Sequence, residues 1–186
     1  MTVFRIVAAL AIAPLATAHV QAAPANWKRY ADAKLGLTVA YPPDWTLAKN
    51  FYDGVPEQHA PHGVSFEIPR SISEGTNLES AFLAVESIPG KICTPDKFDA
   101  DAKGVATLKA DGRSYTRSRD RNDVGFGEFY DTQIFVVDGL PRCLAVHYFI
   151  HVASMTHFAP GEAKPFDPET LWKTFDEIRA TMSFRK

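Results

Sequence analysis

Short stretches in which apolar residues alternate with polar ones, or run together, recur through the middle of the chain. Alternation with a period of two is typical of half-buried strands, because successive side chains point to opposite faces. The pattern predicts eight strands, at residues 37–41, 45–51, 64–68, 81–88, 105–109, 113–121, 126–137 and 140–153. Residues 122–125 (NDVG) predict a turn between the sixth and seventh of them, and the short connections between strands predict an antiparallel sheet.

Apolar residues with a helical period occur near the C-terminal end. Four of them recur at spacings of four, three and four, which places them on one helix face: Leu171, Phe175, Ile178 and Met182. Asp167 and Pro168 precede them as a helix start, and Thr94-Pro95-Asp96 predicts a second helix over residues 94–103. Residues 27–34 predict a short helix or turn. Strands in the middle and helices around them indicate an α+β fold, with helices packed on a mostly antiparallel sheet.

The N-terminal segment has the pattern of an export signal. Arg5 supplies a positive charge ahead of an apolar run at residues 6–16, and the small residues of ATA (16–18) and VQA (20–22) offer cleavage sites. The apolar run is shorter than the roughly 20 residues that span a bilayer. We therefore expect a signal peptide at residues 1–22, cleavage near Ala22, and one periplasmic domain at residues 23–186 with no stable membrane anchor.

Charge and cysteine content narrow the possibilities further. The chain has 20 Lys and Arg against 22 Asp and Glu, a net charge of −2. Nonspecific nucleic-acid binding needs a strong basic excess, so we expect no nucleic-acid partner. The chain has two cysteines, Cys93 and Cys143. In an oxidising compartment one disulfide is the simplest expectation, and two separate free thiols are the alternative.

Both ends of the chain resemble the PsbP-like and DcrB-like proteins. Tyr30 and residues 35–45 (LGLTVAYPPDW) resemble their Gly-hydrophobic-x-hydrophobic-x-Tyr-Pro-x-x-Trp opening, and residues 175–184 (FDEIRATMSF) resemble their closing helix. The resemblance implies an α-β-α sandwich and no shared catalytic residues, since members act mainly as assembly factors, binding modules and chaperones. The residues alone predict that Trp45, placed after a double proline, folds over the end of the preceding strand as a core residue.

An arginine-rich strand is the main candidate for binding. The odd positions of residues 113–121 share one strand face, which bears Arg113, Tyr115, Arg117, Arg119 and Arg121. Guanidinium groups in a row suit phosphate, carboxylate or an acidic partner surface. Alternatively, a turn at 122–125 would set Arg119 opposite Glu128 and Arg117 opposite Tyr130, so that cross-strand pairs occupy the arginines. The candidate binding residues are Tyr115, Arg117, Arg119 and Tyr130.

The histidines are candidates for metal binding. His147 and His151 would lie on one strand face with Phe149 between them, about 13 Å apart, which is too far to share one metal ion. His59 and His62 flank a short loop segment and could chelate together with Glu57. That set lacks a defined fourth ligand, so we predict no metal and no cofactor.

Motifs of the common enzyme classes are missing. The sequence contains no Gly-x-Ser-x-Gly, no His-Glu-x-x-His, no phosphate loop and no Gly-x-Gly-x-x-Gly. The leading hypothesis is an exported, non-catalytic binding, interaction or assembly protein with a protein partner in the periplasm. The alternatives are an immunity or accessory protein for a toxin or secretion system, and a small periplasmic hydrolase, since catalytic triads assemble in space.

Overall fold

The computed structural model describes residues 22–49, 62–90 and 92–185. The strands in this part of the chain are β1 (Lys28–Asp32), β2 (Leu37–Tyr41), β3 (Thr46–Lys49), β4 (His62–Glu67), β5 (Leu78–Ile88), β6 (Ala106–Ala110), β7 (Arg113–Gly125), β8 (Glu128–Val137), β9 (Cys143–Ala153) and β10 (Ser183–Phe184). The helical elements there are α1 (Arg70–Ser73), the 3₁₀ turns η1 (Pro95–Lys97) and η2 (Met155–His157), and α2 (Glu169–Ala180).

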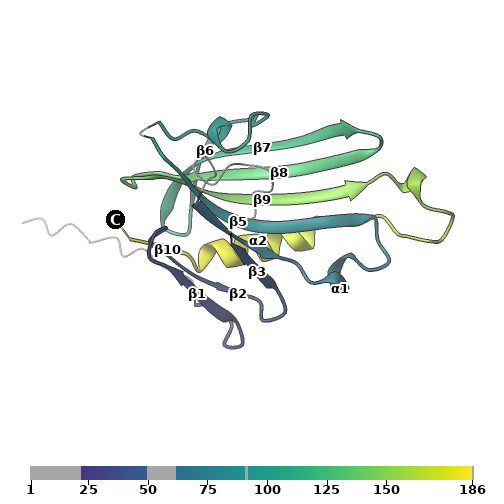
Figure 1. The fold of residues 1–186 in the computed structure, drawn as a ribbon, viewed down its shortest axis with the longest axis horizontal. Coiled ribbons are helices and arrows are strands. Elements are labelled where there is room, and N and C mark those ends of the chain that lie inside the picture. The colour runs from purple at the N-terminus through teal and green to yellow at the C-terminus, as the bar shows by residue number, and fades with distance from the viewer. Residues whose placement is uncertain (1–21, 50–61, 91, 186) are drawn as a thin grey trace, which may run out of the picture.

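The strands form two antiparallel sheets (Figure 1). The large sheet has the order β3-β4-β5-β9-β8-β7-β6, and the small sheet has the order β1-β2-β10. Every pairing between named strands of the described chain is antiparallel. The α+β class and the mostly antiparallel sheet are therefore confirmed.

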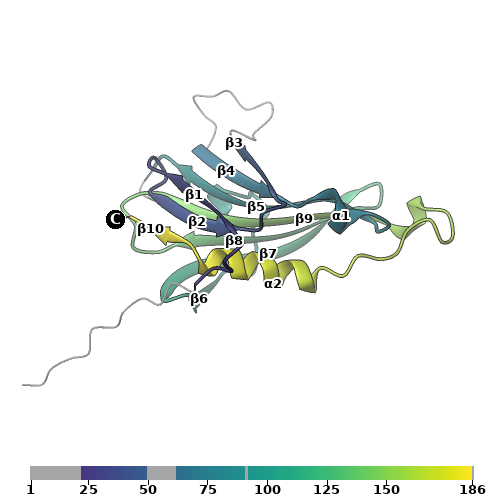
Figure 2. The same cartoon turned by 90° about the horizontal axis from the view of Figure 1, so that it is seen from below.

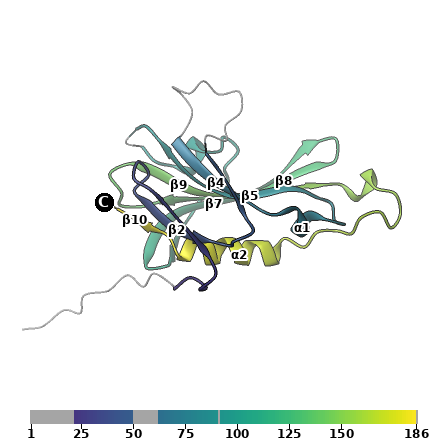
Figure 3. The ribbon, with the colours of Figure 1, turned by 60° about the horizontal axis from the view of Figure 1, so that its bottom comes forward.

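The large sheet has one face turned toward α2 and one turned away from it. The helix face bears Tyr115, Phe135 and Tyr148, which share a buried cluster with residues of α2 and of the small sheet. Figure 3 shows α2 and the small sheet on the same side of the large sheet, and Figure 2 shows α2 running along that side. The outer face, on the other side, bears Tyr130, His147 and Phe149. It is partly covered by the segment around η1, where Phe98, the residue after η1, packs against the buried cluster of Ile134, Val136 and Ala145.

The predicted helix at the C-terminal end is confirmed. The four residues at helical spacing are all buried: Leu171, Phe175, Ile178 and Met182. The Asp167 carboxylate accepts a hydrogen bond from the N–H of Glu169 at 3.1 Å, but Pro168 occupies the N-cap position and not, as predicted, the first position of the helix. Trp45 is also a core residue, since it is 4% exposed and meets the Phe175 ring edge-to-face at 5.7 Å.

Two helix predictions are wrong. The predicted helix over 94–103 is only the 3₁₀ turn η1, and the predicted short helix or turn at 27–34 contains strand β1. After η1, the Asp99 carboxylate accepts hydrogen bonds from the Asp101 N–H at 2.9 Å and from the Thr132 hydroxyl at 3.3 Å. Such side-chain bonds compete with helical ones, and Phe98 is held against the outer face, so the helix does not continue.

A hydrogen-bonded turn after β1 leads to a prediction of pH-dependent stability. The Asp32 carboxylate accepts hydrogen bonds from the N–H groups of Lys34 (2.8 Å) and Leu35 (3.0 Å) and from the Tyr30 hydroxyl (3.0 Å). Burial alone would raise its pKa, but these hydrogen bonds and the nearby His62 lower the pKa below the usual value. A lowered pKa means that the carboxylate stabilises the fold above the unfolded-state pKa of about 3.9, and that this contribution is lost as the pH falls through the folded-state pKa.

We expect Asp32→Asn to lower the free energy of unfolding by about 1–2 kcal/mol at neutral pH. The difference from wild type should shrink as the pH falls from about 3.9 through the lower folded-state pKa of Asp32. The carboxyl group of the wild type is then protonated and neutral, like the amide of the variant. Urea unfolding at a series of pH values measures this difference. A gap between the two proteins that is independent of pH would show that the charge of Asp32 contributes nothing.

Candidate functional site

The arginine-rich strand pairs in a different register from the predicted one. Arg119 lies opposite Gln133 and Arg117 lies opposite Phe135, because β7 continues to Gly125 and the chain turns at Phe126 and Gly127. The predicted turn at 122–125 and the predicted partners Glu128 and Tyr130 are therefore wrong. An irregularity between Asp123 and Gly125 leaves Val124 as an extra residue, which the strand pattern did not reveal.

The four candidate binding residues do not form one site. Tyr115 is buried on the helix face, where the Arg179 guanidinium lies 5.2 Å from its ring centre. Arg117 and Arg119 share that face, and the Arg119 guanidinium lies 5.9 Å from the Trp172 ring. Tyr130 lies opposite Asn122, so it projects from the outer face. The arginine row therefore borders the helix layer, and Tyr130 is on the other side of the sheet.

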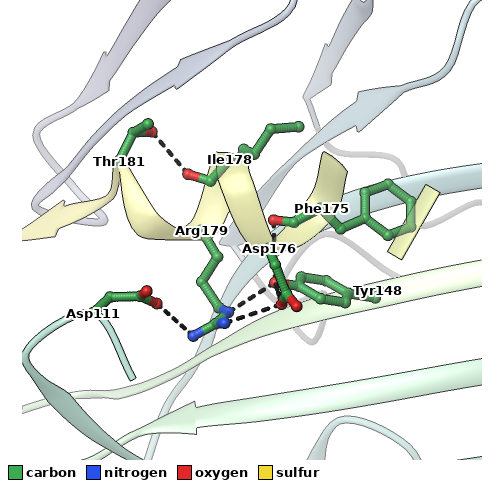
Figure 4. Close-up of polar contacts among 7 residues, drawn as sticks. All are labelled: Asp111, Tyr148, Phe175, Asp176, Ile178, Arg179 and Thr181. Carbon is green, nitrogen blue, oxygen red and sulfur yellow. Dashed lines mark hydrogen bonds and ion pairs between the residues drawn. The ribbon is translucent and has the colours of Figure 1, made fainter. Parts of the chain in front are cut away.

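A buried charge network joins α2 to the helix face (Figure 4). Arg179, 5% exposed, donates through Nε to the Tyr148 hydroxyl at 2.8 Å and through its other nitrogens to Asp111 and Asp176. The Tyr148 hydroxyl lies 3.1 Å from the Phe175 carbonyl oxygen, which it can donate to. Burial raises the pKa of Tyr148 well above its usual value, and it also raises the pKa of Asp111 although Arg179 opposes this. These groups hold the helix on the sheet.

The outer face presents a row of aromatic rings from three adjacent strands. Phe149 in β9 stacks on Phe82 in β5, with ring centres 4.9 Å apart and planes 18° apart. On its other side Phe149 contacts Tyr130 of β8 at 5.1 Å. All three side chains are partly exposed. The row forms because Phe82 and Phe149 are direct cross-strand partners and Tyr130 is diagonal to Phe149.

Histidines flank this row, and each has a carboxylate partner. His147 Nδ1 lies 3.2 Å from Glu86 Oε1, and His151 Nε2 lies 2.6 Å from Glu128 Oε2. His157 in η2 lies 3.6 Å from the other oxygen of Glu128. The predicted placement of His147 and His151 on one face around Phe149 is confirmed. We call Phe82, Tyr130, His147, Phe149 and His151 the histidine–aromatic patch.

The strands beneath the patch bear carboxylates but, over their described ranges, no Lys or Arg. Strands β4, β5, β8 and β9 as described contain no Lys or Arg, whereas they contain five acids: Glu67, Glu79, Glu86, Glu128 and Asp131. Glu67, Glu86 and Glu128 lie on the outer face by their pairing. Beside Phe82 the surface is hollowed by about 610 Å³, in a depression lined by Glu67, Arg70 and Glu79 among others. The patch therefore combines aromatic rings with fixed negative charge.

The sequence did not reveal Glu86, Glu128 and His157 as part of this arrangement. Glu86 had a usable signal, because it is the one acid in the otherwise largely apolar strand segment 81–88 (AFLAVESI). A charge in such a strand needs a partner. Glu86 is indeed 2% exposed and paired. His157 had no such signal, since the connection after β9 brings it back to Glu128 only in three dimensions.

The described residues contain no cluster of three or more His, Cys, Asp or Glu arranged to hold a metal ion. His62 of the loop considered for chelation lies 3.4 Å from Asp32, whereas His59 and Glu57 lie outside the described residues. In the same part of the chain, none of the helices has the length and apolar character that crossing a membrane requires.

The two cysteines lie together in the structure. Cys93 and Cys143 are joined as a disulfide, with Cα atoms 5.1 Å apart and a separation of 50 positions in sequence. Cys143 is the first residue of β9, and Cys93 precedes η1. The bond thus fastens the segment with η1 to the end of the outer face, next to the residues that Phe98 covers.

Comparisons with known proteins identify similarity of fold. No protein-family model matches the sequence, and no curated protein matches it. A solved protein from Bacteroides thetaiotaomicron VPI-5482 is similar at a TM-score of 0.50 and 14% identity, over 87% of this chain and 49% of that one. The two chains share one fold. The present chain spans about half the length of the Bacteroides protein.

Two further solved structures are similar at lower scores. Cyanobacterial PsbP (CyanoP) from Synechocystis sp. PCC 6803 has a TM-score of 0.46 and 15% identity, over 87% of this chain and 94% of that one. The Ran-binding protein Mog1p of Saccharomyces cerevisiae has a TM-score of 0.48 and 11% identity, over 85% and 95%. A PsbP protein is thus among the similar solved structures.

Proposed function

We propose that the chain is an exported, non-catalytic binding protein of the periplasm, and that the histidine–aromatic patch binds a cationic segment of a protein partner. The observation that supports this most is the row of partly exposed rings on strands that have carboxylates and no Lys or Arg. The sequence pattern of residues 1–22 and the disulfide support export.

The chemistry of the patch suits a Lys or Arg side chain of the partner. A cation within about 6 Å of an aromatic ring gains about 0.5–2 kcal/mol, more when water is excluded. Tyr130 and Phe149 offer two adjoining rings for this contact. Glu128 is held by His151 and His157, so its charge has a fixed position beside the rings. Complementary charge of this kind speeds association and selects the partner.

The patch lacks an assembled nucleophile among the described residues. The Glu86–His147 pair resembles the acid and base of a hydrolytic triad, and Ser65 lies on the same face with Ala84 between it and His147. However, no hydrogen bond joins the Ser65 hydroxyl to His147 Nε2, and both atoms are buried without a partner. A serine that is 2% exposed does not present its oxygen to a substrate, which supports the non-catalytic proposal.

A pull-down from periplasmic extract, run beside esterase, phosphatase and peptidase assays, tests the proposal. We expect Tyr130→Ala and Glu128→Gln to weaken capture of the partner by about tenfold, which corresponds to about 1.4 kcal/mol. Asp44→Asn is the control, since Asp44 is an exposed acid in the turn before β3. Capture should also weaken with salt, because exposed charges are screened over about 8 Å at physiological ionic strength.

Turnover that Ser65→Ala abolishes would instead establish the hydrolase alternative. Equal capture by the wild type and both patch variants would show that the partner binds elsewhere on the protein. Capture that is specific for one toxin or one secretion component would support the immunity or accessory role within the same binding function.

A further inference from the structure

The two tight hairpins of the large sheet differ in the first residue of their turn. Asp111 and Gly112 connect β6 to β7 with φ angles of 54° and 69°, and Phe126 and Gly127 connect β7 to β8 with φ angles of 55° and 76°. Two-residue turns with positive φ at both positions are type I′, which favours Asn, Asp or Gly at the first position. The first turn follows this rule. The second has phenylalanine where the backbone disfavours it.

The Phe126 side chain makes no packing contact in the described fold that would offset this conformation. A bulky residue at positive φ is a rare outlier, and such strain persists where it has a function. The Phe126 side chain is 96% exposed, so it gains no packing in return. Val124 beside it is 45% exposed. Asparagine at position 126 would suit both the turn and the solvent better, so the requirements of the fold do not account for the phenylalanine.

The turn is held in place from both sides. The Asp123 carboxylate accepts a hydrogen bond from the Gly125 N–H at 2.9 Å, and the Gly127 carbonyl accepts one from the Ser154 N–H at 2.6 Å. A β-carbon on Gly127 would lie 2.7 Å from His157 Nε2, so the backbone there fits closely against η2. The exposed ring is therefore presented on a fixed support, which reduces the entropy lost when it binds.

We propose that Phe126 is an anchor residue that inserts into an apolar pocket of a protein partner. This inference rests on the proposed function, because Glu128 directly follows the turn and binds His151 of the histidine–aromatic patch. The hairpin lies at the end of the sheet remote from the C-terminus (Figure 1). One partner surface could thus cover the patch with basic residues and receive Phe126 at its edge. Buried aromatic anchors of this kind contribute most of the affinity in many interfaces.

The charges around the tip favour a protein over a membrane as the occupant. Asp123 is exposed, and Glu128 lies at the base of the turn. Arg121 is the basic residue of this end of the hairpin, and its guanidinium lies 5.5 Å from the Phe129 ring. Anionic lipid headgroups would be repelled by the two carboxylates, and stable membrane attachment needs a second signal such as a polybasic patch.

The stability of Phe126→Asn tests whether phenylalanine at this turn destabilises the fold. The variant restores an Asn-Gly turn, and we expect its melting temperature to rise by about 2–4 °C relative to the wild type. Val105→Asn is the control for removal of an exposed apolar side chain, since Val105 is 59% exposed and has no positive φ; it should leave the melting temperature unchanged. A lower melting temperature for Phe126→Asn would show that the ring supports the fold and would overturn the inference.

Site-specific photo-cross-linking in the native host tests whether Phe126 contacts the partner that binds the histidine–aromatic patch. Benzoylphenylalanine placed at position 126 or 130 should give the same cross-linked protein, and at position 105 it should not. With that protein purified as the probe, Phe126→Asn should bind about 30-fold more weakly and Phe126→Tyr nearly as well as wild type. Cross-linking from 130 alone, or equal affinity of Phe126→Asn and wild type, overturns the anchor role and leaves the proposed function intact. Cross-linking from neither position overturns both.

A membrane contact would also overturn the inference. Flotation with phosphatidylethanolamine–phosphatidylglycerol vesicles, lost in Phe126→Asn, would assign the ring to a lipid surface. We expect no flotation of either protein.

Discussion

Replacing Arg179 with methionine is expected to lower the free energy of unfolding by about 3–5 kcal/mol. The side chain is 5% exposed and bonds to Tyr148, Asp111 and Asp176, so its removal leaves polar groups in the core without their partner. Asp111 is affected most, because burial raises its pKa and Arg179 opposes this more strongly than Arg113, the other arginine that does so. Urea unfolding followed by tryptophan fluorescence measures the change.

Asp176→Asn is the matched control for this network. The Asp176 side chain is 55% exposed, and exposed ion pairs contribute about 0–1 kcal/mol. We therefore expect a loss below about 1 kcal/mol for Asp176→Asn. Equal losses in the two variants would show that the guanidinium is stabilised by its exposed partner and that the buried contacts with Tyr148 and Asp111 are energetically neutral.

Removing the disulfide is expected to have the second largest effect, a loss of about 4 kcal/mol in the free energy of unfolding. Cys93 and Cys143 close a loop of 50 residues, and the chain-entropy model relates stabilisation to that loop length. The double variant Cys93→Ala, Cys143→Ala should show this loss without reductant. The wild type should approach the same stability once it is reduced.

Thiol titration of the denatured, unreduced protein provides the control for that experiment. The disulfide predicts close to no titratable thiol. Two thiols per chain would contradict the pairing of Cys93 with Cys143. Equal free energies of unfolding for the oxidised and the reduced wild type would contradict a stabilising role of the disulfide.

Periodicity predicted most of the fold because it reflects burial directly. The helical spacing of Leu171, Phe175 and Ile178 identified α2, and every one of these residues is buried. Alternating stretches identified the central strands, and the double proline before Trp45 predicted its core position. These features depend on local sequence, so no knowledge of the tertiary structure was needed.

Register and turn position were not predictable in the same way. The residues at 122–125 have turn composition, yet β7 continues through them and the chain reverses at Phe126 and Gly127. Phenylalanine is unusual at positive φ, so the actual turn had no recognisable signal. The error moved the predicted partners of Arg117 and Arg119 and placed Tyr130 on the wrong face.

The candidate site was predicted only in part for a related reason. Strand alternation placed His147 and His151 on one face, which the structure confirms. Alternation cannot say which face of a sheet a distant helix covers. The sequence therefore did not show that the arginine row lies on the helix side of the sheet, where Arg119 is exposed and its guanidinium lies 5.9 Å from the Trp172 ring of α2. The carboxylate partners Glu86 and Glu128 belong to other strands and depend on pairing across the sheet.

An NMR titration of the ¹⁵N-labelled protein with the captured partner tests the central proposal most directly. The proposed function predicts that amide shifts change on the outer face, at Phe82, Tyr130 and Phe149 and their neighbours in β5, β8 and β9. Residues of the helix layer such as Glu177 should keep their shifts. Changes confined to the helix face around Arg119 and Arg121, with the histidine–aromatic patch unaffected, would contradict the proposed binding site.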